Sequence, residues 1–310
     1  MVAEFSLPCH ALLRPRSATD LDRHSPPSFA ASAAAAFPSF LSTSIRSAPL
    51  PHLRVSSRAR RWQATTAATM MPESSLVHDL GAAAVTSAVA LLLLRFWEEL
   101  AKRGVFEQKL SRKLVHISIG LVFMLLWPLF SPGSAAPFLA ALAPGINIIR
   151  MLLLGLGIWK NDAMVKSMSR SGDHRELLKG PLYYACTIAI ATSIFWRTSP
   201  IAIAAICNLC AGDGVADIVG RRLGMTKLPY NRNKSLAGSI AMFLAGFLSS
   251  IGYMHYYHMF GFMDESWGMI TRFFVVSLFA AIVESLPISS ELDDNLTVPV
   301  ASLLVGALVF

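Results

Sequence analysis

Two acidic residues interrupt a long apolar run in the second half of the sequence. Asp213 and Asp217 lie in CAGDGVADIVG, and their spacing places both carboxylates on one face of a helix. Charged side chains are costly within a membrane and usually have a function there. Carboxylates bind Mg²⁺, which commonly bridges to substrate phosphates. The pair predicts a metal site; the alternative is a structural ion pair with Arg221 or Arg222.

A basic segment follows the two aspartates. NRNKS at 231–235 offers amide donors, an ammonium and a hydroxyl just before an apolar helix, whose free N–H groups attract anions. The segment is not a Walker A loop, because the required glycines are absent. It predicts phosphate binding by Asn233, Lys234 and Ser235. The alternative is a solvated loop in which Ser235 only caps the helix.

Further charged groups occur at the ends of other apolar segments. SRKLVH at 111–116 contains Arg112, Lys113 and His116, and such cations suit phosphate oxygens. Their alternative role is to anchor the end of a membrane span. Glu284 interrupts the apolar run FAAIVESLPI, and Asp294 belongs to ELDDNLTVP. Both acids could complete a metal shell; an acidic loop would explain Asp294 but not Glu284.

The composition predicts a helical membrane protein. The 310 residues are 54% hydrophobic and 15% charged, and several apolar windows are long enough to span a bilayer. We therefore expect an all-α polytopic bundle with seven or eight spans. The candidate spans are 79–97, 114–131, 136–157, 181–197, 200–219, 236–254, 270–287 and 296–310. Cys207 and Cys210 form a CxxC without a second ligand pair, so we expect buried free thiols, not a zinc site.

The loops alternate in charge. The segments 95–113, 160–179 and 221–234 carry six, five and five basic residues, whereas 255–269 carries none. The positive-inside rule places the basic loops on one side of the membrane. All the candidate site residues then lie near that side. The connector within 160–179 has no strong apolar periodicity, and we expect it to be solvated.

The N-terminal segment has the composition of an organelle transit peptide. Residues 1–71 hold eight Arg, no Lys and three acids, among many Ser and Ala. We predict a plastid transit peptide at about 1–65, cleaved between Val55 and Met71, and a membrane domain at 75–310. The rest of the chain has 19 basic and 16 acidic residues, so nucleic-acid binding is not expected.

Taken together, SRKLVH, CAGDGVADIVGRRLG, NRNKSLAGS and ESLP…DDNLTVP resemble the polyprenol kinase family, and most of all the phytol and farnesol kinases of plant plastids. The resemblance covers roughly 110–310. Arg112, Lys113, Asp213 and Gly220 match motif positions of the family. It implies phosphoryl transfer from CTP to a prenyl alcohol, most simply phytol to phytyl phosphate for tocopherol biosynthesis. It also implies a multi-pass protein of a chloroplast membrane, with its basic loops toward the stroma.

The predicted site contains catalytic, nucleotide-binding and metal-binding residues. Asp213 and Lys234 are the candidate catalytic residues, with Asp213 orienting or deprotonating the alcohol. The candidate nucleotide-binding residues are Arg112, Lys113, His116, Gly220, Asn233 and Ser235. The candidate ligands of Mg²⁺ are Asp213, Asp217, Glu284 and Asp294.

Other activities remain open at this point. The acceptor could be farnesol or another polyprenol. A cytidylyltransferase that joins CTP to a lipid phosphate would use the same groups. An ion-coupled transporter would instead place its acids near the bilayer midplane in an inverted repeat, and no repeat is visible. Apart from the bilayer, a prenyl alcohol and a nucleotide, the sequence predicts no partner.

Overall fold

The computed structural model describes residues 72–169 and 171–310. The predicted transit peptide lies outside the described residues. The described part is helical apart from a two-stranded hairpin. The longer helices are α2 (Pro72–Lys102), α3 (Gln108–Leu125), α5 (Leu142–Gly155), α7 (Gly180–Ile194), α9 (Asp213–Leu223), α10 (Leu236–Met259), α11 (Trp267–Ser285) and α13 (Asp294–Val309). The shorter ones are η1 (Trp127–Leu129), α4 (Ala136–Ala140), α6 (Asp162–Met168), η2 (His174–Leu178), α8 (Pro200–Cys207), η3 (Asn208–Gly212) and α12 (Pro287–Leu292).

Within the described residues, seven helical segments are long and apolar enough to cross a membrane. They correspond to the first seven predicted spans, which confirms the expected all-helical membrane fold. The eighth candidate, 296–310, coincides with α13, which is apolar but has only 16 residues. Buried aromatic and aliphatic side chains from several helices fill the interior, and Trp127, Tyr257 and Phe273 are the largest of them.

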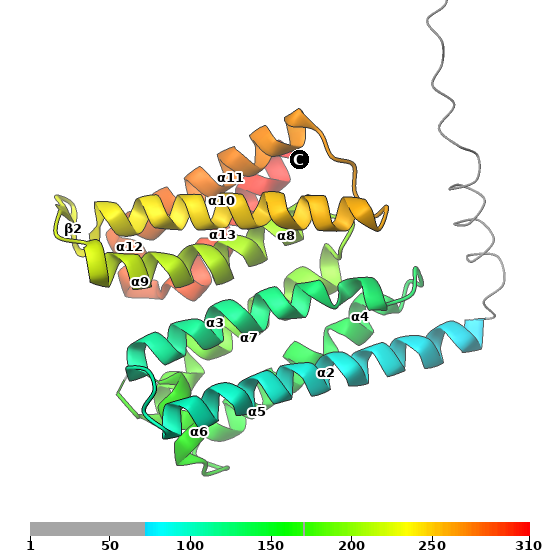
Figure 1. Ribbon diagram of the computed structural model, residues 1–310, viewed down its shortest axis with the longest axis horizontal. Coiled ribbons are helices and arrows are strands. Elements are labelled where there is room, and N and C mark those ends of the chain that lie inside the picture. Colours follow the sequence, from blue (N-terminus) through cyan, green and yellow to red (C-terminus); the bar gives the residue numbers. More distant parts are fainter. Residues whose placement is uncertain (1–71, 170) are drawn as a thin grey trace, which may run out of the picture. The chain divides into compact units, whose positions relative to one another are not determined.

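The helices run side by side in two groups (Figure 1). The N-terminal group contains α2, α3, α5 and α7, and the C-terminal group contains α9, α10, α11 and α13. Helix α3 packs against α9 and so connects the two groups. This contact brings the SRKLVH segment on α3 next to the aspartates of α9.

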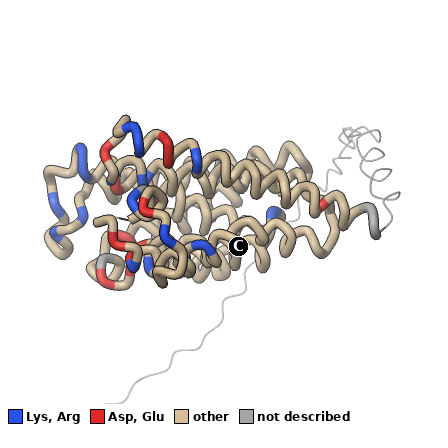
Figure 2. Tube along the Cα trace, turned by 90° about the horizontal axis from the view of Figure 1, so that it is seen from below, with Lys and Arg blue, Asp and Glu red and all other residues tan. Residues whose placement is uncertain are grey.

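Charge is unevenly distributed along the helices. Figure 2 shows most of the Lys and Arg residues, with several acids, gathered at one end of the described helices. The other end carries few coloured segments. Because the connections at the charged end are the three basic segments of the sequence, this distribution agrees with the predicted sidedness.

Two of the basic connections are more ordered than expected. The segment 160–179 is not a solvated connector: it forms α6, which packs on α2 and α3, and η2, which packs on α5. Met164, Val165, Met168 and Leu177 are buried there in one apolar cluster. The segment's apolar residues are too few and too irregularly spaced to predict this packing. NRNKS is not a loop either, because it forms β2 (Asn231–Ser235), which pairs antiparallel with β1 (Lys227–Leu228).

A buried polar cluster closes the opposite end of the helices. Arg197, between α7 and α8, donates hydrogen bonds to the carbonyl oxygens of Trp127, Phe130 and Ser131 at 2.7–2.9 Å. Asp79 on α2 accepts hydrogen bonds from the backbone N–H and the hydroxyl of Ser131, at 2.6 and 2.7 Å. Burial lowers the pKa of Arg197 to about 10, although Asp79 acts in the opposite direction. We call Asp79, Ser131 and Arg197 the distal cluster.

The cysteine prediction is confirmed for the described residues. Cys207 and Cys210 are both free and fully buried on one turn. Tyr184 donates a hydrogen bond to the His116 carbonyl oxygen and lies 3.3 Å from Cys210 Sγ. These thiols therefore belong to the packing of the core.

Candidate active site

A π-helical turn immediately precedes the first aspartate. The residues Asn208–Gly212 form η3 between α8 and α9, and Asp213 follows directly. Such π-bulges in helices are frequent at functional sites. Gly212 and Gly214 sit so close to side chains of α10 and α3 that a methyl group on either would collide with them. The glycines therefore permit the close packing that encloses Asp213.

Asp213 is buried and held by two side chains from α3, the ammonium of Lys113 and the imidazole of His116. Its Oδ2 accepts a hydrogen bond from Lys113 Nζ at 2.7 Å and lies 3.3 Å from His116 Nε2. The same His116 nitrogen lies 2.8 Å from the Leu209 carbonyl oxygen, to which it donates. Only 1% of Asp213 is exposed. The SRKLVH segment, which the sequence only placed on the same side as the aspartate, is therefore in direct contact with it, and Asp213 lies behind Lys113.

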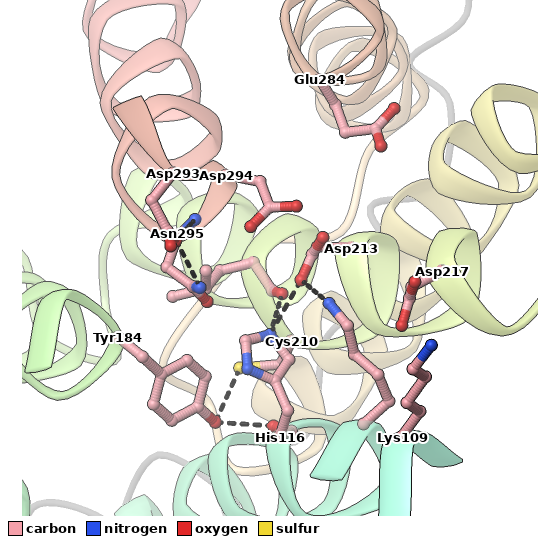
Figure 3. A network of polar contacts seen from close by, with 12 residues as sticks. Lys109, His116, Tyr184, Cys210, Asp213, Asp217, Glu284, Asp293, Asp294 and Asn295 are labelled. Carbon is pink, nitrogen blue, oxygen red and sulfur yellow. Dashed lines mark hydrogen bonds and ion pairs between the residues drawn. The ribbon is translucent and has the colours of Figure 1, made fainter. Parts of the chain in front are cut away.

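A second ionic group lies around Lys234 at the end of β2. Lys234 Nζ donates to Glu284 on α11 and lies 3.5 Å from Asp294 Oδ2 at the start of α13. Burial alone would lower the pKa of Lys234, but the surrounding carboxylates outweigh it and raise the pKa above its usual value. Lys234 is therefore an ammonium at any physiological pH. Figure 3 shows Glu284, Asp294 and Asp213 reaching toward one another from three helices.

These two groups border one large cavity, which we call the polar cavity. Its volume is about 930 Å³. Its cationic lining consists of Lys109, Arg112, Lys113, Lys179, Arg221, Lys227 and Lys234, and its acidic lining includes Asp217, Glu284, Asp293 and Asp294. Because so many cations converge, the cavity suits a ligand with several negative charges.

The hairpin forms one wall of the polar cavity. Asn233 and Ser235 both line it, as predicted for phosphate-binding residues. Ser235 also caps α10, since its hydroxyl accepts a hydrogen bond from the Gly238 N–H at 3.2 Å. Gly220 on α9 lies against this wall, where an added Cβ would approach Ser235 Oγ to 3.2 Å. The cap that was the alternative role of Ser235 is therefore present, and phosphate binding stays a prediction.

The second aspartate of the pair has different surroundings from the first. Asp217 lines the polar cavity, but its Oδ2 lies 2.6 Å from Arg221 Nη2 on the same helix. Both side chains are about one third exposed. This is the ion pair that the sequence offered as the alternative, so the geometry distinguishes Asp217 from Asp213 although both lie on α9.

The four predicted metal ligands do not form a single cluster. Among the described residues, no group of three or more His, Cys, Asp or Glu side chains is arranged to hold a metal ion. Two buried carboxylate oxygens, Glu284 Oε2 and Asp294 Oδ1, have no hydrogen-bond partner within the described part of the chain. Mg²⁺ in phosphate sites usually takes one or two carboxylates, the phosphates and water. Glu284 and Asp294 fit that arrangement, whereas Asp217 does not.

Sequence reasoning overlooked three cations of the polar cavity. Lys109 and Lys179 line it from the ends of α3 and η2, and Lys227 lines it from β1. All three belong to basic segments that the positive-inside rule already explained, so the sequence did not single them out. A functional role could have been suspected only from the crowding of basic segments on the side that also carries Glu284 and Asp294.

The fold and the site define a multi-pass membrane protein with a cavity lined by many cations at one end. Comparison with curated proteins gives a family. The chain is 74% identical to the probable chloroplastic phytol kinase 2 of Oryza sativa subsp. japonica, over 84% of this chain and 86% of that protein. It is 60% identical to the chloroplastic farnesol kinase of Arabidopsis thaliana, over 80% and 81% of the two chains. It is 45% identical to phytol kinase 1 of the same plant, over 82% and 83%.

The chain therefore belongs to the family of plant chloroplastic phytol and farnesol kinases, as its motifs predicted. It is a membrane enzyme of the kinase class, located in a chloroplast membrane. No protein-family profile matches the chain. No solved structure matches it either.

Proposed function

We propose that the protein transfers the γ-phosphoryl group of CTP to the hydroxyl of a prenyl alcohol, most simply phytol. The observation that carries this proposal is the polar cavity, where cations from α3, α9 and β2 converge beside two carboxylates. Each carboxylate has an oxygen without a hydrogen-bond partner in the described part of the chain. A nucleoside triphosphate matches this lining in charge. CTP as the donor rests on the resemblance of the motifs, and the choice of alcohol rests on the names of the relatives.

In this proposal, cations of the polar cavity bind the phosphates and an aspartate positions one of them. Arg112, Lys113 and Lys234 neutralise the phosphate oxygens, and phosphoryl transfer depends mainly on such alignment and charge stabilisation. Asp213 accepts a hydrogen bond from Lys113 and so fixes the position of the ammonium at the cavity wall. A bond forms between the alcohol oxygen and the γ-phosphorus as the bond to the β-phosphate oxygen breaks, which leaves CDP.

The hydroxyl proton needs an acceptor at the wall of the polar cavity. Glu284 and Asp294 both present a carboxylate oxygen there that has no donor among the residues the structure describes. They are better placed than Asp213, whose carboxylate is occupied by Lys113 and His116. Glu284 would hold Mg²⁺, which when bound would neutralise charge on the transferred phosphoryl group. We assign proton acceptance to Asp294, which lies farther from Lys234 than Glu284 does.

Transfer of a radioactive label tests the activity. The protein, reconstituted in liposomes with phytol or farnesol, receives CTP labelled at the γ-phosphate. We expect the label in a prenyl monophosphate, together with unlabelled CDP. Release of the label as pyrophosphate with a lipid phosphate as co-substrate would identify a cytidylyltransferase instead. Absence of a labelled lipid with every prenyl alcohol would contradict the proposal.

A further inference from the structure

Two smaller hollows lie next to the polar cavity, in the apolar part of the molecule. A narrow hollow begins at Arg112 and Lys113, which line both spaces, and passes His116. A second hollow shares Leu94, Ile119, Asn147 and Tyr184 with the first. We call the two hollows together the apolar groove; it is walled mainly by α2, α3, α5 and α7.

The groove runs from the charged end of the helices toward the membrane interior. Its near end is lined by Gly180 and Met151, close to the basic connections, and its far end by Ser87, Phe123 and Ala143. Lys113 and Phe123 lie on the same uninterrupted helix. At the helical rise, their separation along α3 is about 15 Å. The groove therefore has the direction and extent of a hydrocarbon chain anchored at the polar cavity.

One side of the apolar groove is exposed on the surface of the helices that would face lipid. Leu91 on α2 and Ile146 on α5 line the deeper hollow, and 45% and 49% of their surfaces are exposed. On the opposite side of that hollow, Phe123 and Ile188 are almost fully buried. The hollows are narrow, with volumes of about 80 and 60 Å³. A chain lying there would have protein on one side and lipid on the other, and could enter sideways from the bilayer.

Two buried side-chain amide oxygens along the groove are available to accept a hydrogen bond. The side-chain oxygens of Asn147 and Asn295 are buried and have no partner among the residues that the structure describes. Asn147 lies where the hollows meet, and Asn295 lines the end next to the polar cavity. Asn295 is 5% exposed, and its amide nitrogen is already bonded to Asp293. A buried unpaired acceptor is costly, and an alcohol hydroxyl at this end would satisfy Asn295.

We propose that the apolar groove between α2, α3, α5 and α7 binds the prenyl chain of the acceptor alcohol, with its hydroxyl at Asn295 and its far end at Ser87. This inference rests on the proposed function, because it supplies the acceptor for the phosphoryl group in the polar cavity. An alcohol whose chain reaches Ser87 then contacts both hollows.

Three phenylalanine variants on α2 test the groove. Ser87→Phe fills its far end, Ala90→Phe fills its middle, and Ala88→Phe is the matched control because Ala88 is exposed and lines neither hollow. Each variant is assayed with geraniol, farnesol and phytol, which increase in length. Binding of CTP, measured as a rise in Tm, shows that each variant is folded.

Ser87→Phe should lower kcat/KM for phytol roughly tenfold or more while the value for geraniol changes little, since a filled pocket discriminates by chain length. Ala90→Phe should lower the values for farnesol and phytol alike, and Ala88→Phe should change none of them. Equal effects of Ser87→Phe on all three alcohols, or no effect of Ala90→Phe, would overturn the groove assignment. If the unaltered protein phosphorylates no prenyl alcohol, the proposed function fails instead.

Discussion

Buried charges lie at both ends of the helices, and their surroundings differ. In the distal cluster, the Arg197 guanidinium donates to three backbone carbonyl oxygens and lies over the rings of Trp196 and Phe262, at 5.3 and 4.0 Å from their centres. At the charged end, Lys234 holds Glu284 and Asp294, but each carboxylate keeps an oxygen without a partner among the described residues.

The difference separates a structural use of charge from a catalytic one. The donors of Arg197 are bonded to the protein itself, so the distal cluster joins α2, η1 and the start of α8. The group at Lys234 borders the polar cavity and can still bind a ligand. Both ends also show local backbone strain: within the described residues, Trp196 and Asp293 are the non-glycine residues with positive φ, at 52° and 80°.

The largest expected effect is on Glu284. Glu284→Gln removes a carboxylate that we place at the phosphoryl group, and such charge-stabilising groups contribute about 10²–10³ in kcat. The matched control is Glu265→Gln, because Glu265 pairs with His255 at the other end of the helices. Formation of prenyl phosphate per folded molecule measures both. Comparable activity in the two variants would remove Glu284 from the site.

Arg197→Met should act on stability and not on turnover. It removes three hydrogen bonds from a buried cation and leaves carbonyl oxygens unpaired, which should cost about 3 kcal/mol of unfolding free energy. Thermal unfolding in detergent measures the loss, with Arg272→Met on exposed α11 surface as the control. A large fall in turnover of the folded fraction, at unchanged stability, would make the distal cluster catalytic and break the comparison.

Asp213→Asn should have an intermediate effect. The amide cannot hold the Lys113 ammonium as a carboxylate does, so Lys113 should lose its fixed position at the cavity wall. Turnover should therefore fall about 10–100-fold. The KM for CTP should rise in the same variant, since Lys113 is expected to contact the nucleotide. Unchanged turnover would show that Asp213 neither positions Lys113 nor takes part in the chemistry.

The smallest effect is expected for Asp217→Asn. Its partner Arg221 lies one helical turn away on partly exposed surface, and such pairs contribute about 0.3–0.5 kcal/mol. Turnover should change less than about threefold. Assaying Asp213→Asn and Asp217→Asn in the same preparation compares the two aspartates directly. A larger loss for Asp217→Asn would restore it as a metal ligand.

The sequence predicted the spans well because apolar length and loop charge are local properties. It also identified Asp213 and Glu284 as unusual, because charges in apolar runs are rare. Lys234 was identified by its place in a basic segment just before a helix. It could not predict their pairings: Lys113 and Asp213 are joined only by the packing of α3 on α9. The exposed fraction of Asp217 depends on the same packing, so spacing alone made the two aspartates look equivalent.

The hairpin and the distal cluster show two further limits. β1 has only two residues, too short for a strand pattern, yet it makes NRNKS a strand instead of a loop. Asp79 is the first residue of the first predicted span, 79–97. Its partner Ser131 is 52 positions away in an uncharged turn, so no pattern along the chain connects the two.

Nucleotide binding tests the central claim most directly, because it shows which end of the helices holds the ligand. The measurement is the rise in Tm that CTP with Mg²⁺ produces in detergent, about 2.7 kcal/mol of stabilisation at 100 times Kd. The double variant Lys234→Met/Glu284→Gln avoids leaving an unpaired buried charge at that pair. We predict that CTP stabilises the unaltered protein and Arg197→Met equally and fails to stabilise the double variant. Full stabilisation of the double variant, or its loss in Arg197→Met alone, would contradict the account.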